Sequence, residues 1–199
     1  MTRAYEASKR AFDFLAALLL LVILALPLAL VYVLIRLTSS GGGFFVQERA
    51  GKDGRLFKLV KFRTMCKEHR HDPNPAIVIT DDHSGVTALG RVLRKTKLDE
   101  WPQLWNVLKG EMSLVGPRPT VPEQVAEYDD FKRRRLLVRP GVTGLAQVNG
   151  GTALTWDERI QWDVYYVEHR SMWLDVKILF RTVGTLFVGT ERRVRRFGE

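Results

Sequence analysis

The chain has 199 residues and one cysteine, Cys66, which excludes an intrachain disulfide. This length suffices for one compact domain with a short appendage. The 31 Lys and Arg residues exceed the 22 Asp and Glu residues, and the formal net charge of +9 indicates an anionic partner: nucleic acid, an acidic bilayer surface or a phosphorylated substrate. A catalytic thiol at Cys66 is less favoured than an ordinary core or strand-end cysteine.

The first predicted element is an apolar segment from Phe14 to Ile35. It carries no charge over about 22 residues, which is long enough to cross a hydrocarbon core of about 30 Å. Pro27 lies near its middle, removes a hydrogen bond to the carbonyl of Ile23 and favours a kink. Basic residues, which prefer the cytoplasmic side, flank both ends: Arg3, Lys9 and Arg10 before it, and Arg36, Arg49, Lys52 and Arg55 after it. These residues leave open a kinked spanning helix or a helix-break-helix hairpin that enters and leaves one leaflet.

A β-hairpin is predicted after the flexible stretch TSSGGG at residues 38–43. Two strand-like runs flank Asp53-Gly54, a dipeptide suited to positive φ in a tight turn. The period of two in the second strand places Lys61 and Arg63 on the face that carries Phe57 and Leu59. These two cations could meet phosphate, or they could lie at a solvated strand edge.

A loop rich in Pro, Asp and His is predicted next, within "KEHRHDPNPAIVITDDHSG". Its histidines, His69, His71 and His83, do not have the spacing of a known zinc site. Exposed loop histidines are therefore the favoured interpretation.

The following stretch, residues 86–110, has a helical period and contains the adjacent carboxylates Asp99 and Glu100. Pro102 prefers the first turn of a helix, so a helix that starts between Leu98 and Trp101 would hold both carboxylates at its N-terminal end. There the partial positive charge of the helix would stabilise them as anions. An ionised, rigidly held carboxylate can serve as a nucleophile or metal ligand, although ordinary acidic residues in a first turn would give the same pattern.

Two later stretches carry groups suited to phosphate. Arg118 stands between two prolines in "GPRP", which lowers the conformational entropy that its guanidinium loses on binding an anion. The Gly-rich loop at residues 138–151 could bring backbone N–H groups close to phosphate, but it matches no nucleotide fingerprint. Two further helices are predicted within residues 156–188. The apolar face of the last, with Trp173, Ile178, Leu179 and Phe180, could rest on a bilayer or pack into the core.

Four ordered motifs carry a family resemblance: "FKLVKFRTM", "LRKTKLDEWPQLWNVLKGEMSLVGPRP", "RPGVTGLAQVNG" and "SMWLDVKIL". With the apolar segment before them, they closely resemble the bacterial sugar transferases, and more narrowly a small monotopic phosphoglycosyl transferase. The resemblance covers nearly the whole chain. Larger members carry additional N-terminal membrane helices, so this chain looks like a minimal catalytic unit.

The resemblance implies an activity. Such enzymes move a phosphosugar from a UDP-sugar to polyprenyl (undecaprenyl) phosphate, use Mg²⁺ and an Asp-Glu dyad, and start glycoconjugate or exopolysaccharide assembly. The dyad maps onto Asp99 and Glu100, with Asp99 expected to be the nucleophile, to form a covalent phosphosugar intermediate and to contact the metal. The further residues expected in substrate and phosphate binding are Lys61, Arg63, Arg94, Arg118, Gln147 and Asp175.

The resemblance also implies an α+β fold. We expect a re-entrant membrane anchor at residues 1–37, broken at Pro27, and a catalytic domain at residues 38–199 that is mostly helical, with a small β-hairpin and amphipathic helices at the membrane surface. Leu26 replaces the Ser that often precedes the proline in the family, which affects the break angle. The expected location is the bacterial inner membrane, with the catalytic domain on the cytoplasmic face against phospholipids; a homo-oligomer is compatible with this arrangement.

Three alternatives remain open at this stage. A membrane-anchored nucleic-acid binder would explain the net charge, but the basic residues are scattered and no reading motif is present, so nucleic acid is not expected as a partner. A non-catalytic basic scaffold is disfavoured by the intact carboxylate pair. A sugar transferase that releases UDP instead of UMP is the alternative among enzymes.

Overall fold

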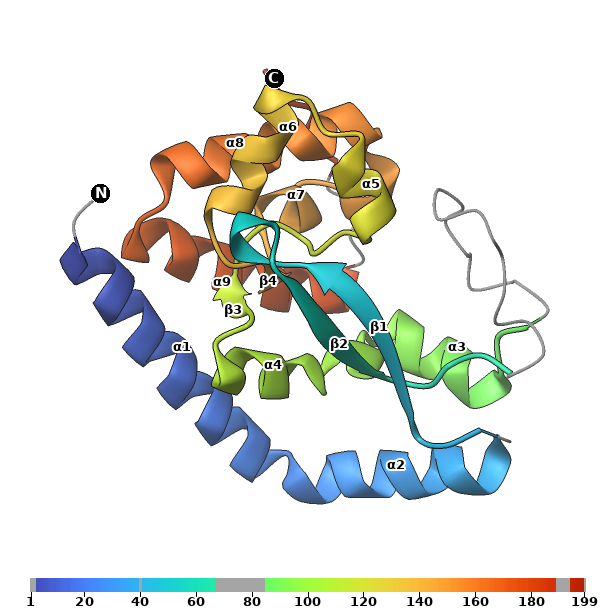
Figure 1. Cartoon of the computed structure of the whole chain (residues 1–199). Helices are drawn as coiled ribbons and strands as arrows, with labels where there is room; N and C mark the ends of the chain where they lie inside the picture. Colours follow the sequence, from blue (N-terminus) through green and yellow to red (C-terminus); the bar gives the residue numbers. More distant parts are fainter. Residues whose placement is uncertain (1–2, 40, 67–84, 189–193, 199) are drawn as a thin grey trace.

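The computed structural model describes residues 3–39, 41–66, 85–188 and 194–198 (Figure 1). The fold is α+β and mostly helical, with a small antiparallel β-hairpin, as the sequence predicted. The predicted loop that holds His69, His71 and His83 lies outside the described residues.

The apolar N-terminal segment forms two helices, α1 (Arg3–Ile23) and α2 (Ala25–Thr38), which meet at a bend of 64°. Pro27 lies in the first turn of α2, where a missing N–H costs little. It cannot donate to the carbonyl of Ile23, so the break falls one turn before the proline, at Leu24. Within the described residues no one helix is long and apolar enough to cross a membrane, while this bent pair meets the requirement jointly on length and composition.

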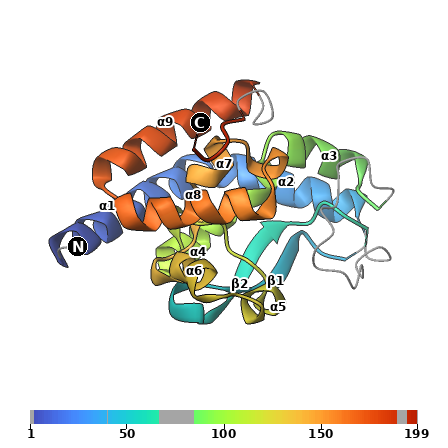
Figure 2. The same ribbon diagram turned by 90° about the horizontal axis from the view of Figure 1, so that it is seen from above.

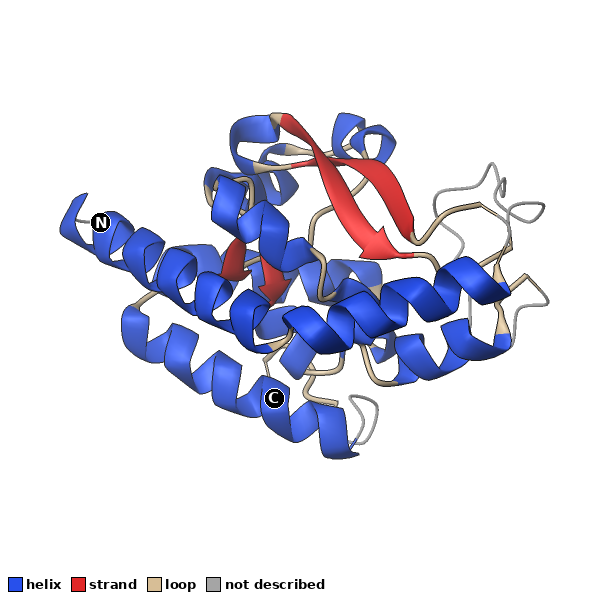
Figure 3. Cartoon of the chain, turned by 90° about the horizontal axis from the view of Figure 1, so that it is seen from below, coloured by secondary structure: helices blue, strands red, loops and turns tan. Residues whose placement is uncertain are grey.

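The two ends of this helix pair have different surroundings. Near its start, α1 packs on the core: Leu114 N donates to the Asp13 carboxylate at 3.2 Å, and Arg10 donates to the Val107 carbonyl at 2.6 Å. Helix α2 packs beneath Phe62 through the buried Ile35. The two helices run along one side of the molecule (Figure 3). Their outward side chains are exposed and apolar, among them Leu15, Leu19, Val22, Ile23, Leu26, Leu30 and Leu37.

The predicted hairpin is confirmed. Strands β1 (Phe44–Ala50) and β2 (Leu56–Phe62) pair antiparallel. A 3-10 turn, η1 (Lys52–Gly54), joins them, with φ of 57° at Asp53 and 74° at Gly54. Phe57 and Leu59 enter the core, so Lys61 on the same face is directed inward at the end of the hairpin.

The helical stretch at residues 86–110 is divided into three elements: α3 (Ala88–Lys95), the 3-10 turn η3 (Leu98–Glu100) and α4 (Gln103–Lys109). Lys97 adopts a left-handed conformation with φ of 55° and separates α3 from η3. Pro102 stands at the N-cap of α4. The two carboxylates therefore lie in a tight turn that precedes α4, and not within its first turn as the sequence predicted.

A second, parallel strand pair was not predicted from the sequence. Strand β3 (Ser113–Val115) pairs with β4 (Gly141–Thr143), and β4 lies within the stretch interpreted as a Gly-rich loop. The backbones approach closely beyond β3, because a Cβ on Gly116 would lie 2.5 Å from the Arg139 carbonyl oxygen. This contact anchors the segment that leads to Arg118.

The remaining helices complete the core. They are α5 (Pro122–Ala126), α6 (Asp130–Arg133), η4 (Arg134–Leu137), α7 (Leu145–Val148), η5 (Gly151–Ala153), α8 (Trp156–His169) and α9 (Met172–Val188). Helix α7 packs against both α8 and α9 (Figure 2). The predicted apolar face of α9 is divided: Ile178 is buried in the core, whereas Trp173 and Phe180 are 66% and 75% exposed.

Candidate functional site

Three segments meet at Glu100. Lys61 at the end of β2 donates to Glu100 Oε1 at 2.8 Å. Arg118, in the loop after β3, donates from Nη2 to Oε1 at 2.6 Å and from Nη1 to Oε2 at 3.3 Å. This two-pronged geometry is the one in which guanidinium and carboxylate bind most strongly. The structure therefore brings together three of the residues that the sequence predicted for the site.

Charge and burial act differently on the two neighbouring carboxyl groups. Burial alone would raise the pKa of Glu100, but the charges and hydrogen bonds of Arg118 and Lys61 outweigh it and hold that pKa well below its ordinary range. Burial and the negative charge of Glu100 raise the pKa of Asp99 to about 6, against the opposing charges of Lys61, Arg118 and Arg94. Glu100 is thus the firmly ionised member of the pair.

This result corrects the predicted cause of ionisation. The sequence assigned the stabilisation of both anions to the start of a helix, but the cations that stabilise Glu100 come from β2 and from the loop after β3. Asp99 is shifted in the opposite direction to the prediction, because its environment is less solvated and an anion stands next to it. Its carboxylate accepts no hydrogen bond from the residues that the structure describes. A carboxylate with that freedom can approach an electrophile.

Two other predicted residues are related to this cluster less directly. Arg94, in the last turn of α3, favours the ionised form of Asp99 by its charge. Gln147 in α7 donates to the Val142 carbonyl at 3.2 Å, and its Oε1 is buried without a hydrogen-bond partner among the described residues. An added Cβ on Gly144 would lie close to both Gln147 and the Gly116 carbonyl. Gln147 is therefore beside the segment that leads to Arg118.

Arg63 and Asp175 each make hydrogen bonds outside this cluster. Arg63 donates to the carbonyl oxygens of Gly42 at 2.8 Å and Phe44 at 2.9 Å, and so holds the start of β1. Asp175 is buried, pairs with Lys9 of α1 at 2.8 Å and accepts a hydrogen bond from Tyr166 at 2.7 Å. Arg63 thus contacts the segment that joins α2 to β1, and Asp175 contacts the first half of α1.

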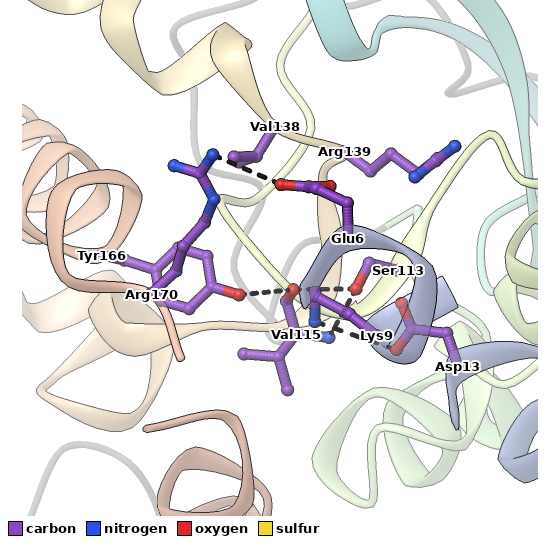
Figure 4. Close-up of a pocket in the computed structure, with 9 residues that line it drawn as sticks. All are labelled: Glu6, Lys9, Asp13, Ser113, Val115, Val138, Arg139, Tyr166 and Arg170. Atoms are coloured by element: carbon purple, nitrogen blue, oxygen red, sulfur yellow. Dashed lines mark hydrogen bonds and ion pairs between the residues drawn. The ribbon is translucent and has the colours of Figure 1, made fainter. Parts of the chain in front are cut away.

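The polar network around Asp175 joins α1 to the core. In the close-up of this region, Lys9 and Asp13 point from α1 toward Ser113, and Glu6 points toward Arg170 (Figure 4). The Glu6–Arg170 pair measures 3.3 Å and the Lys9–Asp13 pair 3.9 Å. Burial raises the pKa of Asp13 against the opposing charge of Lys9. This network therefore connects the N-terminal helix α1 to the rest of the domain.

Three further cations act on this cluster by their charge, and the sequence analysis did not include them in the site. Burial and the like charge of Arg118 lower the pKa of Arg49 to about 10. The same two causes lower the pKa of Arg159 on α8, and burial lowers that of Lys97 against the attraction of Glu100. Lys97 could have been proposed from its position two residues before Asp99. Arg49 and Arg159 are distant in sequence, and only folding brings their charges to Arg118.

A divalent cation is compatible with the residues present. Among the described residues, no three His, Cys, Asp or Glu side chains gather to hold a metal by themselves. Mg²⁺ keeps several waters and is commonly bound by one or two carboxylates together with substrate phosphates. Asp99, which accepts no hydrogen bond from the described residues, fits that pattern better than Glu100, which two cations already hold.

Comparison with known proteins identifies the family. The profile described as "Bacterial sugar transferase" matches residues 4–189, and the chain belongs to that family. It is 42% identical over 180 residues to the uncharacterized sugar transferase EpsL of Bacillus subtilis, covering 90% of this chain and 87% of EpsL.

Longer relatives carry more specific names. The chain is 41% identical over 191 residues to the UDP-N-acetylgalactosamine-undecaprenyl-phosphate N-acetylgalactosaminephosphotransferase of Aeromonas hydrophila, covering 93% of this chain and 45% of that protein. It is 43% identical over 186 residues to the undecaprenyl-phosphate glucose phosphotransferase of Komagataeibacter xylinus, covering 88% of this chain and 35% of that one. The chain therefore spans less than half the length of these two relatives.

Proposed function

We propose that this chain transfers a phosphosugar from a UDP-sugar to undecaprenyl phosphate, or a similar polyprenyl phosphate, and releases UMP. The relatives named as undecaprenyl-phosphate sugar phosphotransferases support this reaction class. The two relatives reported above are named for different sugars, N-acetylgalactosamine and glucose, so the proposal does not extend to the sugar. The observation that carries the proposal is the contrast between Asp99 and Glu100: two cations hold Glu100, whereas Asp99 accepts no hydrogen bond from the described residues.

In the proposed first step, a carboxylate oxygen of Asp99 attacks the β-phosphorus of the UDP-sugar. A new P–O bond forms to Asp99, the bond between the β-phosphorus and the bridging oxygen breaks, and UMP leaves with that oxygen and its electron pair. In the second step, a phosphate oxygen of the polyprenyl phosphate attacks the same phosphorus and displaces the Asp99 carboxylate. The products are a polyprenyl-diphosphate sugar and the restored enzyme.

The surrounding cations make an anionic nucleophile compatible with an anionic substrate. Lys61 and Arg118 already oppose the charge of Glu100, and Arg94 acts on Asp99. Such fixed charges stabilise the negative charge that develops on transferring phosphoryl groups. Bound Mg²⁺ would supply further charge neutralisation at the phosphates, with Asp99 and those phosphates as its oxygen ligands. Glu100 positions Lys61 and Arg118 beside the reacting groups.

The proposed location is the cytoplasmic face of the bacterial inner membrane. The bend between α1 and α2, together with their exposed apolar side chains, supports a re-entrant anchor within residues 1–37 that lies among phospholipids. The exposed Trp173 and Phe180 of α9 support an additional contact with the bilayer surface. In this arrangement the active site of the domain at residues 38–199 can meet a lipid-linked acceptor.

The experiment that tests the mechanism omits the acceptor. The purified chain with Mg²⁺ and a panel of UDP-sugars should release UMP up to about one equivalent per enzyme with its cognate sugar, and the protein mass should rise by one phosphosugar. Asp99→Asn should abolish both results, whereas Asp53→Asn, in the exposed hairpin turn, should retain them. Release of UDP would indicate sugar transfer without phosphate. UMP that appears only with undecaprenyl phosphate present, with no trapped adduct, would indicate direct transfer between the substrates.

A further inference from the structure

Arg49 lies against the loop that carries Arg118. It is the second-to-last residue of β1, and its neighbour Ala50 donates a backbone hydrogen bond to Thr120 at 2.9 Å, which ties the end of β1 to that loop. The Arg49 side chain reaches the same loop, because Nη1 donates to the Pro119 carbonyl at 3.4 Å. Two guanidinium groups are thus held on adjoining backbone segments.

The hydrogen-bonding capacity of Arg49 is only partly used. Nη2 donates to Gln47 Oε1 at 2.7 Å, but Nε is buried and has no partner among the described residues. Within those residues, no carboxylate forms an ion pair with Arg49 at 4.0 Å or less. A partly buried cation without a close counter-ion is unfavourable, so its surroundings are suited to an anion that comes from outside the chain.

The neighbouring charges favour the same interpretation. Burial and the repulsion of Arg118 lower the pKa of Arg49 to about 10, against the smaller attraction of Glu100 and Glu123. Glu100 uses two donor groups of Arg118, and a guanidinium has five N–H donors in all. Arg118 can therefore contact a second anion while it remains paired with Glu100. Such an anion would also remove the repulsion between the two arginines.

We propose that Arg49 and Arg118 together bind one phosphate group, Arg49 from β1 and Arg118 from the loop after β3. The inference rests on the proposed function, in which the phosphate belongs either to the nucleotide sugar or to the polyprenyl acceptor. Two guanidinium groups bind either phosphate by the same charge-assisted hydrogen bonds. Arg49 is then a substrate-binding residue of the site.

The experiment compares three variants of the full chain in detergent micelles. Arg49→Gln removes the charge, Arg49→Lys keeps the charge without the planar fork, and Arg55→Gln removes an exposed arginine from the same hairpin as a matched control. Binding is measured separately with UDP and with undecaprenyl phosphate. Arg49→Gln should weaken binding of one probe about tenfold, Arg49→Lys should weaken it less, and Arg55→Gln should leave it unchanged. The affected probe identifies which phosphate the site takes.

Thermal unfolding separates phosphate binding from a structural role. If Arg49 serves the ligand, the rise in Tm that the affected probe produces should be smaller in Arg49→Gln than in the unaltered chain, whatever the Tm of the free variant. Unchanged binding of both probes in Arg49→Gln would overturn the inference. If that variant does not fold, unchanged binding in Arg49→Lys would do the same, as would failure of the unaltered chain to bind either probe. Weakened binding in an enzyme that releases no UMP would refute the proposed function and leave the phosphate site standing.

Discussion

The adjacent carboxylates Asp99 and Glu100 should have opposite effects on stability when each is made neutral. Burial and Glu100 raise the pKa of Asp99 from 3.8 to about 6, so the folded protein disfavours the ionised form. Arg118 and Lys61 hold the pKa of Glu100 below its ordinary value of 4.5, so the folded protein favours that anion. Asp99→Asn should therefore stabilise the protein at neutral pH, and Glu100→Gln should destabilise it.

The size of the Asp99 effect follows from linkage. The shift in pKa from 3.8 to about 6 corresponds to at most about 3 kcal/mol of unfolding free energy above pH 7, since one pKa unit is about 1.4 kcal/mol. The penalty grows as pH rises through this interval, and at pH 5 it should be about half as large. For a chain of this length, about 3 kcal/mol corresponds to a Tm increase of roughly 6–12 °C as an upper bound.

Glu100 has the reverse dependence on pH. Because its pKa is lowered in the folded state, its contribution is present above pH 4.5 and is lost as pH falls. Glu100→Gln also leaves Lys61 and Arg118 close together without their shared anion. A loss on the order of 1.5–3 kcal/mol is expected from charge-assisted hydrogen bonds of this kind.

Thermal or denaturant unfolding at pH 7.5 and pH 5, with EDTA present so that no metal neutralises the carboxylates, measures both effects. Asp53→Asn is the control, because that aspartate is exposed in the hairpin turn; it should change Tm little at either pH. A lower Tm for Asp99→Asn, or an increase of the same size at both pH values, would refute the electrostatic reasoning. So would a stabilised Glu100→Gln variant.

Two further predictions concern the N-terminal helices. Pro27→Leu should restore the donor for the Ile23 carbonyl and straighten the 64° bend. The test places cysteines at the exposed Ala4 and Thr38 in a Cys66→Ser background. Both should resist impermeant thiol reagents in intact cells when Pro27 is present, and one of them should become labelled in the Pro27→Leu chain. Asp175→Asn should lower Tm, because Asp175 pairs with Lys9 at 2.8 Å, but the UMP burst per folded molecule should persist. Loss of the burst at unchanged Tm would instead indicate that Asp175 takes part in the reaction.

The sequence alone determined the features that depend on local chain chemistry. Asp53-Gly54 predicted the hairpin turn, because positive φ is readily adopted by few residues. Pro27 predicted the break in the apolar segment, because it has no N–H to donate to Ile23. The ordered motifs predicted the family, which the comparison confirmed. Each of these inferences uses neighbours within a few residues or the order of motifs along the chain.

Tertiary structure decided which carboxylate is held and which side chains surround it. Glu100 is held by Lys61 and Arg118, which come from two other segments, and the burial that raises the pKa of Asp99 has no counterpart in a sequence pattern. Asp175 lies in the motif "SMWLDVKIL", but in the folded chain it pairs with Lys9 of α1. Arg49 reaches the loop of Arg118 because the end of β1 contacts Thr120. Charge interactions depend on distance and solvent exposure in three dimensions, and the order of residues along the chain specifies neither until the chain has folded.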